Sequence, residues 1–150
     1  MGAGSGFRRR GRSPSAKRSV AESDGGISAS VEVDEERDKS GRYAYCWPRD
    51  SVLVYKALDF IGFENMTKKL YENFLRKTQE KNGMWEQRFY TDGRLAPCWG
   101  YQIDETATVV YGAYRHFEVM VKKTGKKDKK FLKDNLKMLE KATKFLEKYM

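Results

Sequence analysis

Apolar residues recur at three- and four-residue steps over much of this 150-residue chain, as they do in helices that bury one face. The spacing predicts four helices, at residues 50–61, 64–79, 105–123 and 128–149. Asp50 or Ser51 is expected to cap the first helix, and Asp104 the third. Gly62 and Gly125 are expected to end these two helices. The predicted fold class is therefore all-α.

The segments outside the helices show other patterns. Residues 26–34 alternate apolar and polar, which predicts a short β-strand or an extended segment near the N-terminus. Residues 81–100 are irregular and aromatic, with turn signals at residues 82–83 and 92–93. A small hairpin or a long ordered loop fits this segment, and its aromatic side chains need a surface on which to pack.

The net charge of +9 comes from the two ends of the chain. Residues 1–19 are rich in Gly, Ser and Arg, which predicts a disordered basic tail before a folded part at residues 20–150. Residues 122–150 contain eleven lysines against four acidic residues, and we interpret this series as the solvated face of the fourth helix. Because basic and aromatic residues are not interleaved on one element, no nucleic-acid partner is expected.

Several other kinds of protein are excluded by simple counts. No apolar run approaches the length of a membrane-spanning helix, so no membrane partner is expected. The two cysteines, Cys46 and Cys98, are too few for a disulfide scaffold, which favours a cytoplasmic location. Neither lies in a Cys/His pattern, so the sequence indicates no metal site and no cofactor. The single histidine, His116, is expected to be a partly buried packing residue of the third helix.

Two clusters of aromatic and charged residues each lead into a predicted helix. Residues 41–50 read GRYAYCWPRD, and residues 98–105 read CWGYQIDE. An aromatic ring can cover the apolar face of a pyranose, while Arg, Asp and Gln side chains bind its hydroxyl groups. Arg49 suits this role because its guanidinium presents planar, preorganised donors. The clusters therefore indicate sugar binding, provided that they lie close together in the fold.

The same residues also admit a purely structural interpretation. The turn before residue 50 would then only start a helix, with Arg49 in a salt bridge to Asp50 or Asp104. The aromatic side chains would pack on the core. Composition and spacing leave both interpretations open.

The two clusters, with residues 25–30, 82–85 and 92–93, resemble the N-terminal part of the catalytic domain of glycoside hydrolase family 15. This is the glucoamylase family, which also contains glucodextranases and some trehalases. The resemblance covers about residues 18–149, and the ordered pair of clusters is its most specific part. It implies an (α/α)6 barrel, in which inner and outer helices alternate. The four predicted helices would form a partial barrel of this kind.

The resemblance also implies roles for individual residues. The tryptophan, arginine and aspartate of the first cluster would hold the non-reducing terminal glucose, with a tyrosine beside the bond that is cleaved. The tryptophan of the second cluster would contact the sugar and support the catalytic acid, and its glutamine and aspartate would fix the loop. The implied substrate-binding residues are Tyr43, Trp47, Arg49, Asp50, Trp99, Gln102 and Asp104.

Enzymes of this family invert the anomeric centre with a carboxylic acid and a carboxylate base that activates water. The resemblance places both beyond Met150, so no catalytic residue is expected in this chain. Asp104 and Glu105 lie at a helix start, where the helix dipole favours the ionised form, and neither is expected to serve as the acid. Glu86 and Asp92 are not assigned this role either.

The expected activity is the inverting release of glucose from the non-reducing ends of α-linked glucans or oligosaccharides. The chain is expected to be a truncated part of such an enzyme, inactive alone, with the rest of the barrel as its partner. Because four helices cannot close a barrel, an apolar surface is expected to be exposed. The alternative is a non-catalytic helical module that binds a sugar or a partner subunit.

Overall fold

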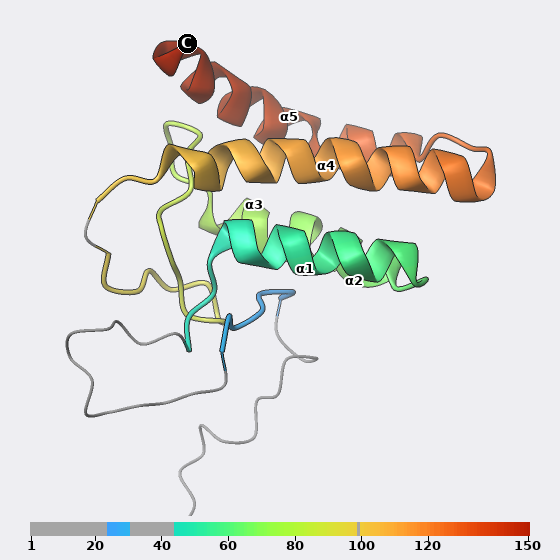
Figure 1. Ribbon diagram of the computed structural model, residues 1–150. Helices are drawn as coiled ribbons and strands as arrows, with labels where there is room; N and C mark the ends of the chain where they lie inside the picture. The colour runs from blue at the N-terminus through green and yellow to red at the C-terminus, as the bar shows by residue number, and fades with distance from the viewer. Residues whose placement is uncertain (1–23, 31–43, 99) are drawn as a thin grey trace, which may run out of the picture.

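The computed structural model describes residues 24–30, 44–98 and 100–150, and most of these are helical (Figure 1). The described part contains no named strand, so the all-α prediction is confirmed. The basic tail at residues 1–19 and residues 31–34 of the expected extended segment lie outside the described residues, and residues 26–30 of that segment form no strand. The helical elements are α1 (Pro48–Phe60), α2 (Glu64–Lys69), η2 (Leu70–Leu75), α3 (Arg76–Thr78), α4 (Ile103–Thr124), α5 (Lys129–Leu146) and η3 (Glu147–Tyr149).

The starts of α1 and α4 differ from the prediction. α1 begins at Pro48, before Asp50 and Ser51, and α4 begins at Ile103, before Asp104, so none of these three residues is the cap. Neither helix has a side-chain hydrogen bond from its capping position. Proline is well suited to the first position of α1, because its φ is already helical and it has no N–H to satisfy.

The predicted second helix is continuous in sequence but not regular in structure. Its middle, η2, is π-helical, and α2 and α3 flank it. Four side chains of η2 are buried, among them Tyr71, whose hydroxyl donates a hydrogen bond to the carbonyl of Val109 over 2.9 Å. The irregular turn therefore places Tyr71 against the middle of α4.

α1 and α4 run side by side in the same direction, with both N-terminal ends at the left of Figure 1. Gly112 of α4 makes this close approach possible, because a Cβ there would overlap Val52 of α1 and the hydroxyl of Tyr71. α5 returns along α4 in the opposite direction after Gly125, which ends α4 with a φ of 66°, as predicted. The described helices thus form a small bundle in which α4 lies between α1 and α5.

One apolar core joins the helices and the loop before α4. Its buried members are Cys46, Val52, Tyr55, Leu70, Tyr71, Phe74, Leu75, Trp85, Phe89, Val109, Ala113, Phe131, Met138 and Ala142. Other large apolar side chains remain outside it. Leu53 and Phe60 of α1, Ile61 at its C-cap and Phe63 after it are each more than half exposed. Large apolar side chains are therefore accessible on α1 and just after it.

The described part of the segment between α3 and α4 is an irregular loop that contains a tight turn. Phe89 forms antiparallel bridges with both Cys46 and Leu95. The turn closes where the N–H of Tyr90 donates to the carbonyl of Arg94 over 2.8 Å. Trp85 anchors the loop, since it is fully buried and its indole N–H donates to the Leu75 carbonyl over 2.9 Å. Trp85 and Phe89 of this loop therefore pack on the apolar core of the helices.

Candidate functional site

The first turns of α1 and α4 are joined by Glu105. The main-chain N–H of Arg49 donates to Glu105 Oε2 over 2.7 Å. A donor in the first turn of a helix has no partner within that helix. Glu105 therefore satisfies a donor of α1 from a neighbouring helix, in place of the side-chain cap that was expected from Asp50 or Ser51. Ser51 is buried instead, with its hydroxyl 3.2 Å from the sulfur of Cys46.

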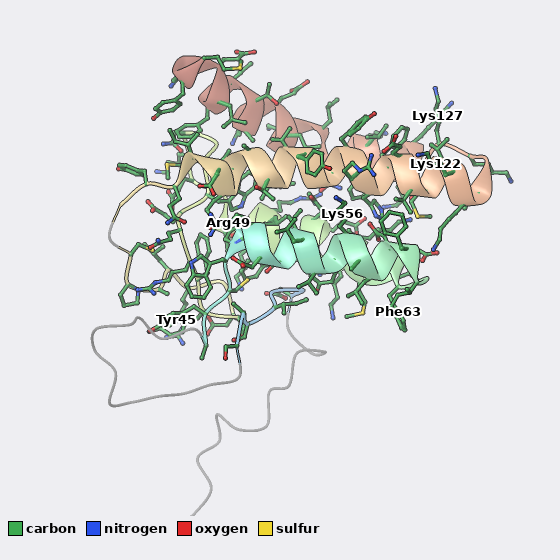
Figure 2. All side chains as sticks on the ribbon, viewed as in Figure 1. Tyr45, Arg49, Lys56, Phe63, Lys122 and Lys127 are labelled. Atoms are coloured by element: carbon green, nitrogen blue, oxygen red, sulfur yellow. The ribbon has the colours of Figure 1, made fainter. Side chains whose placement is uncertain are left out.

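The Arg49 side chain extends from the start of α1 toward the start of α4 (Figure 2). Its Nη1 donates to Oδ2 of Asp104. Its Nη2 lies 3.5 Å from Oε1 of Glu105 and 3.9 Å from Oδ2 of Asp50. One guanidinium thus meets three carboxylates, and the two sequence clusters converge in space at this point.

These charges hold Arg49 in its protonated form. Partial burial alone would lower the pKa of Arg49, but the hydrogen bond with Asp104 and the charges of Glu105 and Asp50 outweigh it and raise the pKa. The Arg49 side chain remains 33% exposed, and Asp50 and Asp104 are 47% and 59% exposed. A permanent cation and two accessible carboxylates therefore face solvent together.

Glu105 behaves differently from the expectation for an acidic residue at a helix start. Burial raises the pKa of Glu105 to about 7, although the N–H and the charge of Arg49 both act to lower it. The helix dipole was expected to favour the ionised form, but the side chain is fully buried and loss of hydration outweighs that effect. Within the described residues, Oε1 of Glu105 has no hydrogen-bond partner.

Trp47, which precedes α1, is 9% exposed and packs within the loop region. The ring of Tyr45 lies edge-on to it at 6.2 Å. The guanidinium of Arg88 lies 5.7 Å from the Trp47 ring and 4.9 Å from the Tyr45 ring. The small Tyr45–Trp47 cluster therefore supports the start of α1, and little of the indole face is accessible.

Gln102 lies immediately before α4, and its carbonyl accepts the N–H of Glu105 over 3.1 Å. Its side-chain Oε1 is buried without a hydrogen-bond partner in the described part of the chain. Tyr43 and Trp99, the other two implied sugar contacts, lie outside the described residues. The structure thus brings Arg49, Asp50 and Asp104 together.

Residues of the loop that leads into α4 line a shallow, open hollow of about 670 Å³. The side chains that line it include Glu86, Tyr90, Leu95, Cys98 and Tyr101. Arg49 and its carboxylate partners are not among its described lining residues. The hollow is therefore next to the Arg49 site along the chain, through Tyr101 and Gln102, but is not the same surface.

His116 and Cys46 are buried in the fold, and Cys98 is partly buried. His116 is 1% exposed, more buried than expected, and its Nδ1 lies 2.9 Å from Oδ2 of Asp59. Asp59 also accepts the hydroxyl of Thr67 over 2.6 Å. Cys46 and Cys98 are free thiols, and burial raises the pKa of Cys46 to about 12. Within the described residues, no group of His, Cys, Asp or Glu side chains is placed to hold a metal ion.

The capping role of Glu105 was not foreseen from the sequence. Arg49 and Glu105 are 56 positions apart, so no local pattern connects them. The available signal was the position of each residue at the start of a predicted helix. Two residues at helix starts can be expected to pair only when the two helices are known to lie side by side in the same direction.

The chain is similar to one curated protein named as an uncharacterized glycosyl hydrolase, from Methanocaldococcus jannaschii. The two are 28% identical over 127 residues, which cover 85% of this chain and 18% of that relative. The chain therefore spans about a fifth of the relative's length. This similarity links the chain to glycosyl hydrolases at a general level.

Two other comparisons gave no match. No model of a known protein family matches the chain. The comparison with solved structures also found no match. In the described part of the chain, no helix combines the length and apolar character needed to cross a membrane.

Proposed function

We propose that this chain carries part of the sugar-binding site of a glycoside hydrolase of the glucoamylase type. The observation that carries the proposal is the contact between Arg49 and the carboxylates at the start of α4. The glycosyl hydrolase name of the relative from Methanocaldococcus jannaschii supports the same class of protein. The proposed ligand is the terminal glucose of an α-linked oligosaccharide or polysaccharide.

The chemistry of the Arg49 site fits neighbouring hydroxyl groups. Each sugar hydroxyl both donates and accepts hydrogen bonds. Arg49 supplies donors only, while Asp50 and Asp104 supply acceptors, and all three side chains reach solvent. A vicinal diol can therefore pair one hydroxyl with the guanidinium and the next with a carboxylate.

The proposed reaction needs two further groups, a catalytic acid and a catalytic base. An inverting hydrolase uses an acid that protonates the leaving oxygen and a base that activates water. The resemblance assigns neither group to a residue of this chain. The role of this chain in the proposal is to bind and orient the sugar through Arg49, Asp50 and Asp104. By resemblance, Tyr43, Trp47, Trp99 and Gln102 would complete the binding site.

Binding of maltotriose to the full 150-residue chain tests the proposal. We expect saturable binding by isothermal titration calorimetry, and weakening by about 10- to 100-fold in Arg49→Lys. A hydrogen bond to a charged group contributes about 1.5–3 kcal/mol, and lysine cannot reproduce the planar pair of donors. Glucose release from maltotriose by this chain alone is expected to be absent.

Arg115→Lys is the matched control. Arg115 lies further along α4, where it pairs with Glu118 at the next turn, so the same substitution removes a guanidinium away from the site. The control is expected to bind maltotriose like the unchanged chain. Equal binding by Arg49→Lys, or no saturable binding by the unchanged chain, would contradict the proposal.

A further inference from the structure

The carboxylates around Arg49 fall into two kinds. Asp104 and Asp50 are about half exposed, so water competes for both. Glu105 is fully buried, and it holds Arg49 at two points, the main-chain N–H and the guanidinium Nη2. The buried carboxylate is therefore the fixed partner of Arg49, and the exposed ones are exchangeable.

The two nitrogens at the tip of Arg49 are consequently not equivalent. Nη2 faces the buried Glu105, at 3.5 Å, and Nη1 bonds the exposed Asp104. A sugar hydroxyl can replace Asp104 on Nη1 with a modest loss, because a solvent-exposed ion pair contributes little. It cannot reach Glu105, whose side chain has no accessible surface.

We infer that Glu105 is a positioning residue, which fixes Arg49 through its main chain and Nη2 so that Nη1 is presented to a sugar hydroxyl. This inference rests on the proposed sugar-binding function. Glu105 does not touch the ligand; it acts through Arg49. The same geometry ties sugar affinity to the ionisation of Glu105, because the attraction to Nη2 requires a charged carboxylate.

The surroundings of Glu105 place this ionisation near neutral pH. Burial raises its pKa to about 7, and Arg49 of α1 opposes that effect. Asp50 of α1 and Asp104 of α4 both raise the pKa further, and the thiol of Cys46 lies within the same electrostatic environment. Above pH 7 the carboxylate is charged and holds the guanidinium. Below it, the neutral acid still accepts the N–H of Arg49 but no longer attracts Nη2.

The first experiment needs no sugar. In the labelled 150-residue chain, the amide ¹⁵N shift of Arg49 and the carboxyl ¹³C shift of Glu105 are followed by NMR from pH 5 to 9. We expect both to titrate together near pH 7, and the Arg49 transition to disappear in Glu105→Gln. Asp104→Asn is the matched control, and it is expected to keep the transition. An Arg49 amide that does not titrate with Glu105 would overturn the inference, whatever the ligand.

The second experiment adds maltotriose and measures its dissociation constant at pH 6 and pH 8. If only the ionised form presents Arg49 correctly, the constant is expected to rise by about tenfold at the lower pH, in proportion to the lost competent fraction. Glu105→Gln is expected to bind weakly and equally at both pH values. If the affinity for maltotriose does not change with pH and is the same in Glu105→Gln, the role of Glu105 is overturned. The proposed sugar-binding function is not affected by that result.

The two readouts separate the inference from the function on which it rests. The Arg49 amide and Glu105 could titrate together while maltotriose does not bind at any pH. That result would refute the sugar site and the role of Glu105 in it. The electrostatic contact between Arg49 of α1 and Glu105 of α4 would still be supported. If Glu105→Gln does not fold, which circular dichroism shows, the titration and binding curves of the unchanged chain still decide the question.

Discussion

At the scale of single residues, Glu105 combines two opposing requirements. Its burial favours the neutral acid, whereas its contacts with Arg49 favour the charged form. Burying a carboxylate costs free energy that one partner at 3.5 Å does not fully recover. The residue therefore lowers the stability of the fold at the pH where it holds Arg49 best.

This conflict predicts how stability depends on pH. The folded-state pKa of Glu105 is about 7, above its ordinary 4.5. Between these values the folded chain keeps a proton that the unfolded chain has released, so the free energy of unfolding falls as pH rises. The loss from this group is of the order of 3 kcal/mol. Urea denaturation at pH 5 and pH 8 measures it.

Glu105→Gln removes the titrating group while keeping its size. Its free energy of unfolding is expected to fall less between pH 5 and pH 8 than that of the unchanged chain. Glu140→Gln, on the exposed side of α5, is the matched control and should retain the original dependence. Identical pH dependence in Glu105→Gln would show that Glu105 is not the responsible group.

At the scale of elements, the contact between α1 and α4 depends on one glycine. A Cβ at Gly112 would overlap Val52 and the hydroxyl of Tyr71. Tyr71 is itself fixed by η2 and by its hydrogen bond to Val109. The glycine therefore sets the distance between the two helices whose first turns form the site.

Gly112→Ala is expected to destabilise the chain by about 1–3 kcal/mol, the usual cost of overpacking. Alanine would otherwise stabilise a helix interior, so a loss reports the close contact rather than helix propensity. Chemical denaturation measures the effect.

Val52→Ala supplies the control, because it removes one of the two obstructing groups. The cost of Gly112→Ala is expected to be smaller in the Val52→Ala background, which a double-mutant cycle reveals. Equal costs in both backgrounds would exclude a clash with Val52.

The elements also show how far sequence reasoning reaches. Helical periodicity located all four helical regions, and Gly125 marked the end of α4, because both depend on residues close in sequence. The π-helical turn of η2 and the capping of α1 by Glu105 were missed, because both depend on packing between distant segments. The sequence analysis named a contact between Arg49 and Asp104 as one possibility, and sugar binding required the two clusters to lie close together. It did not predict the burial of Glu105.

At the scale of the whole molecule, the outer side of α1 is unusual for a small bundle. Leu53, Phe60 and Ile61 are 51%, 58% and 68% exposed, and Phe63 continues the series at the end of α1 remote from Arg49 (Figure 2). Exposed apolar surface of this kind marks an interaction site or an aggregation hazard.

The exposed series predicts binding of a hydrophobic dye by the folded chain. Fluorescence of ANS is expected to increase with the unchanged chain, and to increase much less with Phe60→Ser combined with Ile61→Ser. Leu136→Ser is the control, since Leu136 is equally accessible, at 54%, but lies on α5. Dye fluorescence that is unchanged in the α1 variant would place the apolar surface elsewhere.

The bond from Arg49 to Glu105 also has a consequence for the order of folding. It closes 56 positions of chain, and the entropy lost in such a closure must be offset by contacts that form at the same time. The first turn of α1 can therefore acquire this hydrogen bond only when α4 is docked against it. During synthesis, the nascent chain acquires the Arg49 site only when residue 105 has left the ribosome and returned to the start of α1.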